Sequence, residues 1–130
     1  MTPSQLRTRT RQFAIDVIRF SRRLPRTDEA RVIKWQLLRA GTSVGANYRA
    51  ACRAKSDADF AFKIGTCLEE SDEAGYWLEL LDHAGILDAN ALAPLVREAD
   101  ELTRIFVSSR ETVRARIRKN KGKLGNIRDL

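Results

Sequence analysis

The segment that most constrains the fold carries two glycines and three polar side chains at helical spacing among apolar residues. Arg39, Ser43 and Asn47 recur every four residues, and Gly41 and Gly45 do the same on an adjacent row. Residues at this spacing lie on one face of an α-helix. Glycine in a helix interior costs about 0.8–1 kcal/mol relative to alanine. Two glycines one turn apart therefore predict that another backbone or a bulky ring packs closely against this helix.

Apolar residues recur at helical spacing in four segments, and no β-strand pattern competes with them. The first segment starts within residues 2–4 and is stopped by Pro25. The second runs from an N-cap at Thr27 to about Arg53. Their predicted core stripes contain Leu6, Phe13, Val17, Phe20, Leu24, Ile33, Leu37, Ala40, Val44 and Tyr48.

The third and fourth segments have recognisable ends. Ser56 caps the third helix, with Asp59 in a capping-box arrangement, and Gly85 ends it as a left-handed C-terminal cap. The fourth helix starts near Asn90, because Pro94 is tolerated only in a first turn. The predicted core stripes contain Phe60, Ile64, Cys67, Leu68, Ser71, Gly75, Leu78, Leu81, Leu92, Leu95, Ala99, Leu102, Phe106 and Val113.

Four helices joined by short connections predict an all-α fold, an antiparallel up-and-down four-helix bundle formed by residues 1–119. At 130 residues, the chain has the length of one domain. Beyond about Lys119 the apolar period stops, and we expect residues 120–130 to form a basic, flexible tail. Cys52 and Cys67 have neither metal-ligand nor redox spacing, so we expect both to be small buried hydrophobic residues without a disulfide.

Several blocks of the sequence resemble one protein family. The blocks are Arg39-Ala-Gly-Thr-Ser-Val-Gly-Ala-Asn47-Tyr48, Ser56-Asp-Ala-Asp-Phe60, Lys63, Glu70, Glu73 and Tyr76-Trp77-Leu-Glu-Leu-Leu81. They resemble the four-helix-bundle family that is named after proteins encoded in intervening sequences of bacterial 23S ribosomal RNA genes. The resemblance is close over about a third of the chain and implies a homopentamer. The accessory protein of diversity-generating retroelements is similar in fold, and there a basic pentamer binds nucleic acid and a reverse transcriptase. The resemblance implies no catalytic residues.

Charge is distributed unevenly along the chain. Residues 1–26 hold seven basic and one acidic residue, residues 27–109 hold nine and fourteen, and residues 110–130 hold eight and two. An up-and-down bundle brings the start of helix one and the end of helix four to the same end. The basic pole predicted there contains Arg7, Arg9, Arg11, Arg110, Arg114, Arg116, Arg118, Lys119, Lys121 and Lys123. Ring symmetry would repeat this pole in every subunit and present a cationic rim to a phosphate backbone.

A second interpretation of the basic ends is equally open. Basic residues at helix C-termini also complement the helix dipole and keep small proteins soluble. The tail has no aromatic residue to stack on single-stranded bases, so backbone contacts without sequence selection are the better prediction if nucleic acid binds. No apolar run is long enough to cross a bilayer, and arginines interrupt the N-terminus, so we expect a cytoplasmic protein with no membrane partner.

Polar stripes on helices two and three are predicted to meet beside the core. A short turn joins these helices, so Asn47 should lie opposite Lys63, and Arg39 opposite Glu70 and Glu73. The structural or interface motif comprises Arg39, Ser43, Asn47, Asp59, Lys63, Glu70, Glu73 and Trp77. An ion-pair network is the favoured interpretation, within one chain or across a subunit boundary.

A metal site is the weaker interpretation of the same carboxylates. Di-metal bundles use Glu-x-x-His pairs, and the single histidine, His83, does not lie three residues after a Glu. We expect His83 at the surface, and Tyr76 with Trp77 in packing or subunit contact, with a ligand platform as the alternative. We therefore expect no cofactor and no metal. A non-enzymatic homo-oligomer, most simply a pentamer, would bind RNA or DNA, or instead serve as a scaffold for a protein partner.

Overall fold

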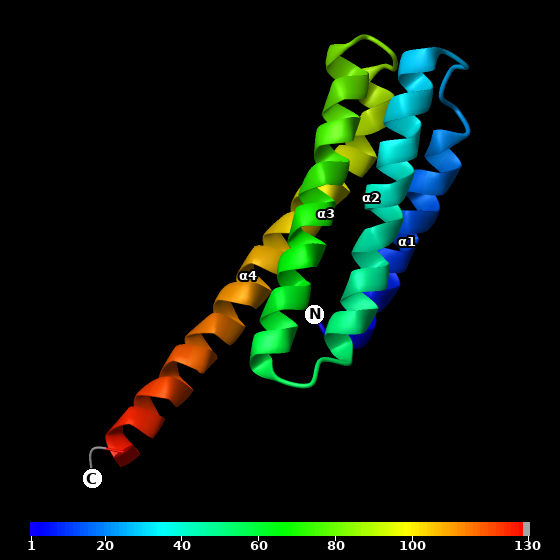
Figure 1. Ribbon diagram of the computed structural model, residues 1–130. Coiled ribbons are helices and arrows are strands. Elements are labelled where there is room, and N and C mark those ends of the chain that lie inside the picture. The colour runs from blue at the N-terminus through cyan, green and yellow to red at the C-terminus, as the bar shows by residue number, and fades with distance from the viewer. Residues whose placement is uncertain (129–130) are drawn as a thin grey trace.

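The chain folds into four α-helices, as the apolar spacing predicts, and contains no strand within the described residues (Figure 1). The structure is a computed structural model, which describes residues 1–128, with side chains described through Leu124. The helices are α1 (Pro3–Ser21), α2 (Asp28–Cys52), α3 (Asp57–His83) and α4 (Ala89–Arg128). Successive helices run antiparallel, so the molecule is an up-and-down four-helix bundle (Figure 1).

The packing around the bundle is uneven. α2 packs against both α1 and α3, and α3 packs along α4, whereas α1 and α4 touch over a much shorter length. α4 is the longest helix, with 40 residues, and its C-terminal part projects past the end of the other three helices (Figure 1). The projecting part lies on the side of the bundle where α1 begins and where α2 connects to α3.

Side chains at the helix ends satisfy free backbone groups much as the sequence predicts. The Ser56 hydroxyl accepts a hydrogen bond from the Asp59 N–H at 3.0 Å, as predicted, but the Asp59 carboxylate accepts from the Lys55 N–H at 3.1 Å and not from the Ser56 N–H of a capping box. At the other end of α3, Gly85 has φ +70°, and the following N–H donates to the Leu81 carbonyl at 2.9 Å. This left-handed cap reverses the chain into α4.

The core consists of the predicted apolar stripes. The four residues Phe13, Val17, Leu37 and Phe106 are each at most 1% exposed. Each helix contributes one face to a single cluster, and the only buried polar side chains in the described part of the chain are Thr10, Ser21 and Ser71. Burying one face per helix around one core is what makes the antiparallel arrangement stable.

The two glycines of α2 mark the closest contact between helices. A Cβ atom on Gly41 would lie 3.0 Å from both γ-methyl groups of Val17, and one on Gly45 would lie 3.4 Å from the backbone carbonyl carbon of Thr10. The predicted close packing is thus confirmed, and the closely packed partner is α1. Glycine is required here because any side chain would push the two helices apart.

The structure corrects two details of the sequence prediction. Cys67 is buried, but Cys52 is exposed, because it follows buried Ala51 at the last turn of α2 and is rotated about 100° away from the core. α4 begins at Ala89, so Pro94 lies in the second turn and not the first. The hydrogen bond that Pro94 cannot donate would reach Asn90, an exposed residue near the helix end.

The helix continues beyond the point where the apolar period was predicted to stop. α4 remains helical from Lys119 through Arg128, and Leu124 extends the stripe of Val113 and Ile117 along the projecting part. The flexibility expected of residues 120–130 stays a prediction, and the last two of these residues lie outside the described part of the chain. Within residues 1–128, no helix has an apolar stretch long enough to span a bilayer.

Candidate nucleic-acid interface and the α2–α3 ion pairs

The start of α1 and the later part of α4 meet at one end of the bundle. Arg7 and Arg116 both line a hollow of about 440 Å³, together with Lys55, Tyr48 and Phe60. Because α1 and α4 are antiparallel there, basic residues from opposite ends of the sequence come close together. This juxtaposition follows the prediction made from topology and charge.

Not every basic residue of that pole is available to a ligand. Arg116 donates two hydrogen bonds to Asp57, at 3.0 and 3.1 Å, and Arg114 lies 3.9 Å from Glu111. Arg9 binds Glu98 at 2.6 Å and also binds Glu101. These hydrogen bonds and charges raise the pKa of the Arg9 guanidinium further above its ordinary value. Arg9 therefore links α1 to α4 and is not available to bind a ligand at the candidate interface.

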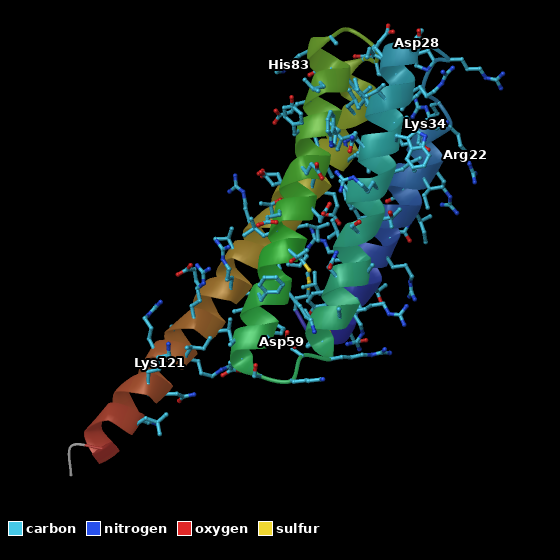
Figure 2. The ribbon with its side chains drawn as sticks, viewed as in Figure 1. Arg22, Asp28, Lys34, Asp59, His83 and Lys121 are labelled. Atoms are coloured by element: carbon cyan, nitrogen blue, oxygen red, sulfur yellow. The ribbon has the colours of Figure 1, made fainter. Side chains whose placement is uncertain are left out.

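Four other cations of the predicted basic pole form a separate group on the projecting part of α4. Arg118, Lys119, Lys121 and Lys123 are exposed, and no carboxylate of the described side chains lies within 4 Å of them. Figure 2 shows Lys121 well beyond the body of the bundle. Of the eight predicted phosphate-binding residues, Arg7 and Arg116 thus line one hollow, four form a projecting arm, Arg11 lies in a groove between α1 and α2, and Arg114 lies beside Glu111 on α4.

Between α2 and α3, the predicted ion pairs form around Arg39. Its guanidinium lies 3.3 Å from the Glu70 carboxylate and 2.5 Å from the Glu73 carboxylate, and it also donates to the Gln36 side chain at 3.1 Å. The structure therefore confirms that Arg39 lies opposite both glutamates. The network crosses the seam of two helices near the surface, since 45% of the Arg39 side chain is exposed.

The other polar residues of the stripe bond within their own helices. The Ser43 hydroxyl donates to the Arg39 carbonyl at 2.6 Å, and the Asn47 amide donates to the Ser43 carbonyl at 2.8 Å. Lys63 pairs with Asp59, one turn away on α3, at 3.0 Å. This pair and the Lys55 N–H lower the pKa of the Asp59 carboxyl. Local partners are closer than the opposite helix, so no Asn47–Lys63 bond forms among the described side chains.

The two carboxylates of the Arg39 network differ in their electrostatics. Partial burial raises the pKa of Glu70, and the neighbouring charge of Glu73 raises it further against the opposing attraction of Arg39. The hydrogen bond to Glu73 is the main cause of the raised pKa of Arg39. The strongest pair is therefore Arg39–Glu73, while Glu70 is held in a partly desolvated position beside a like charge.

We expect Arg39→Gln to lower the free energy of unfolding by about 1 kcal/mol at pH 7, because two close carboxylates then lack their cation. The raised pKa of Glu70 favours its protonated form in the folded state, so the loss should shrink as the pH falls through that pKa. Urea unfolding at pH 7 and pH 4 measures both values. Arg104→Gln, which breaks the exposed pair with Asp100, is the control. Equal losses of unfolding free energy at the two pH values would contradict the repulsion between the Glu70 and Glu73 carboxylates.

The aromatic pair Tyr76 and Trp77, in the C-terminal half of α3, combines an exposed ring with a packed one. Trp77 packs against the core, and its buried indole N–H has no hydrogen-bond partner among the described residues. The Tyr76 ring lies 5.0 Å from the Trp77 ring in an edge-on arrangement, and 52% of Tyr76 is exposed. Trp77 is thus a packing residue, whereas Tyr76 presents an apolar surface.

The positions of His83 and of the acidic and cysteine side chains bear on the metal-site interpretation. His83 is exposed at the C-terminal end of α3 (Figure 2). Within the described residues, no group of three or more His, Cys, Asp or Glu side chains is placed to hold a metal ion. Burial raises the pKa of the Cys67 thiol to about 12, so this thiol stays protonated in the core.

Sequence reasoning did not single out Arg49, which lies across the α1–α2 groove from Arg11. It also did not assign the cations at the opposite end of that helix pair, where Arg22, Arg26, Arg31 and Lys34 surround a second hollow. The net charge of residues 1–26 was the available signal. It could not identify the face of α1 that carries the charge, because that depends on which residues turn toward α2.

Comparison with known proteins gives a consistent result. The family model for the 23S rRNA-intervening sequence protein matches residues 4–108, and no curated protein matches the chain. The fold is similar to a crystal structure from Bacteroides thetaiotaomicron, a protein of unknown function from the S23 ribosomal protein family. The two are 30% identical with a TM-score of 0.76, over 85% of this chain and 99% of that one. The chain therefore belongs to the family of 23S rRNA-intervening sequence proteins.

Proposed function

We propose that the protein is a non-enzymatic homo-oligomer, with five subunits as the family resemblance suggests, and that it binds RNA or DNA through its basic pole. The observation that carries the proposal is the unpaired positive charge at the end of the bundle where α4 projects. The phosphate contacts would come from Arg7, Arg11, Arg118, Lys119, Lys121 and Lys123, and also from Arg114 and Arg116 if a phosphate displaces Glu111 and Asp57 from them.

Exposed apolar side chains support the oligomeric part of the proposal. Val32 and Trp35 on α2 are 61% and 73% exposed, and Phe62 and Tyr76 on α3 are 76% and 52% exposed. Large aromatic side chains are enriched at protein interfaces, where neighbouring copies remove them from water. We infer that these four exposed side chains of α2 and α3 contact neighbouring subunits.

Charge supports the nucleic-acid part. The whole chain carries a formal net charge of +7, and Arg118, Lys119, Lys121 and Lys123 of α4 have no carboxylate within 4 Å among the described side chains. Lysine and arginine bind phosphates with release of condensed counterions, so affinity should fall steeply as salt rises. The projecting helix presents no aromatic side chain through Leu124, so backbone contacts without sequence selection are the expected mode.

Light scattering of the purified protein, with and without a short RNA or DNA duplex, tests both parts. The expected mass without nucleic acid is about five subunits, and the mass should rise when duplex is added at low salt. It should return to the protein value at moderate salt, because counterion release drives the association. A monomer would refute the assembly, and a mass that ignores the duplex at every salt concentration would refute the binding.

The exposed aromatic residues also favour a second candidate function, a scaffold for a protein partner. Trp35 and Phe62 are the most exposed large apolar side chains, and a partner protein could cover them in place of a second copy. In that case, the basic arm would only keep the protein soluble. Pull-down of one specific protein that survives nuclease treatment would favour the scaffold, whereas loss of the captured material with nuclease would favour nucleic-acid binding.

A further inference from the structure

We infer that the outer face of the α1–α2 pair is a phosphate-binding surface on which a nucleic-acid backbone lies along the helices. The inference rests on the proposed function and adds a site to the basic pole. Two clusters of cations, one near each end of this helix pair, line separate hollows. We refer to them as the lower groove, which contains Arg11, and the upper hollow, which contains Arg22.

The lower groove has the composition of an anion site. Three arginines line its volume of about 510 Å³, accompanied by three hydroxyl side chains and small residues, and no carboxylate lies among its lining residues. The cations and hydroxyls are Arg7, Arg11, Arg49, Ser4, Thr8 and Thr42. The small residue at the α1 contact is Gly45, whose missing side chain lets α1 approach α2 closely beside the groove. Guanidinium and hydroxyl groups are the usual donors to backbone phosphates; the Thr42 hydroxyl already donates to the Leu38 carbonyl at 2.6 Å, so the hydroxyl donors would be Ser4 and Thr8.

The upper hollow, where α1 turns into α2, is also lined by cations and by no carboxylate, but it has no hydroxyl side chain among its lining residues. Its volume is about 400 Å³, and its cations are Arg22, Arg26, Arg31 and Lys34. Figure 2 shows Arg22 and Lys34 at the same end of this helix pair. The nearest ion pair is weak, because Arg31 and Asp28 are 3.7 Å apart and both are largely exposed.

Three arginines on other faces of the bundle have carboxylate partners, unlike Arg11 and Arg49 of the lower groove. Arg9, Arg39 and Arg116 turn toward α3 or α4, and each lies within 3.3 Å of a carboxylate. Arg11 and Arg49 have no carboxylate within 4 Å among the described side chains. Like charges gathered around one groove repel each other, and a bound polyanion would relieve that repulsion.

The spacing of the two clusters suits an extended ligand better than a single phosphate. Arg11 and Arg22 are eleven positions apart, which corresponds to about 16 Å along α1 at 1.5 Å per residue. A duplex presents one phosphate per strand every 3.4 Å or so, so the clusters would span about five base-pair steps. Ala14 and Ile18, which lie between them on the same side of α1, carry no charge, whereas Asp16 lines a hollow beside α4.

Charge-matched double variants test the inference by fluorescence anisotropy with a labelled 12-base-pair duplex over a salt series. Arg11→Gln with Arg49→Gln removes two charges from the lower groove, and Arg22→Gln with Lys34→Gln removes two from the upper hollow. Each pair should weaken binding about tenfold at low salt and make the slope of log affinity against log salt shallower by about 2. The control, Arg97→Gln with Arg104→Gln on the outer side of α4, should change affinity less than about twofold.

The outcomes separate this inference from the proposed function. If the unaltered protein shows no salt-dependent binding, both fail. If it binds, but the two α1–α2 pairs behave like the control while Lys119→Gln, Lys121→Gln and Lys123→Gln together abolish binding, the arm is the site and the inference is overturned. All of these positions are exposed or half-buried, so circular dichroism should be unchanged and a loss of affinity should not reflect unfolding.

Discussion

Phe106→Ala should lower the free energy of unfolding by about 3–5 kcal/mol, the largest effect that we expect from a single substitution. Phe106 is 0% exposed, and its ring lies 6.1 Å from the Tyr48 ring of α2. Truncation would therefore remove buried apolar area and leave a cavity between α2 and α4 that the packed helices cannot fill. Urea unfolding followed by circular dichroism, at one protein concentration, measures the change.

Val107→Ala is the matched control on the next position of α4. Val107 is 40% exposed, so its truncation should cost less than about 1 kcal/mol. The ratio between the two losses tests the orientation of α4, because rotation of the helix by one residue would exchange the two environments. Similar losses for Phe106→Ala and Val107→Ala would mean that α4 does not present the predicted stripe to the core.

Gly41→Leu should lower the free energy of unfolding by about 2–3 kcal/mol, the second largest effect. A Cβ at this position would already lie 3.0 Å from two methyl groups of Val17, and a larger side chain would force α1 and α2 apart. Leucine favours the helix more than glycine does, so a loss would have to come from the contact between helices. Urea unfolding and the far-ultraviolet circular dichroism of the folded state distinguish lost stability from lost helix.

Gly65 provides the control for Gly41, because it lies within α3 with only the end of the Arg110 side chain near its Cβ position, at 3.9 Å. Gly65→Ala should stabilise the protein by about 0.5–1 kcal/mol through helix propensity alone. Val17→Ala should be less harmful in a Gly41→Ala background than alone, since the smaller residue makes room. If Gly41→Ala stabilised the protein as much as Gly65→Ala, the close contact would be wrong.

The proposed ligand site depends on which arginines are already neutralised. Arg7, Arg9 and Arg11 alternate along α1, yet only Arg9 faces Glu98 of α4, while Arg7 and Arg11 turn toward the grooves. A helix rotates about 100° per residue, so alternate residues point in different directions. Sequence reasoning placed all three in one pole, and only the packed helices distinguish a bundle-stabilising arginine from one that is available to a phosphate.

The interhelical network illustrates what local spacing can and cannot predict. The short connection between α2 and α3 fixed the register well enough to place Arg39 opposite Glu70 and Glu73, and the structure confirms this. The same register placed Asn47 opposite Lys63, but each finds a partner on its own helix. Register determines which residues are near each other, whereas the choice of partner depends on side-chain reach and on competing neighbours.

By itself, the sequence determined the number of helices, their order and the faces that they bury. These properties depend on apolar periodicity, on the cap at Ser56 and on the stop at Gly85, all of which act within a few residues. The spacing of Gly41 and Gly45 also predicted the close approach of another helix, since glycine destabilises a helix interior and is favoured there only where space is needed.

Only the tertiary structure decided which cations remain free, how far α4 projects and which helix meets the glycines. Pairing of Arg116 with Asp57 depends on the rotation and separation of whole helices, which no local pattern encodes. The two cationic hollows of the α1–α2 face arise in the same way, from residues distant in sequence that packing brings together. Short-range interactions define the elements, but charge acts through space, so its arrangement follows from packing.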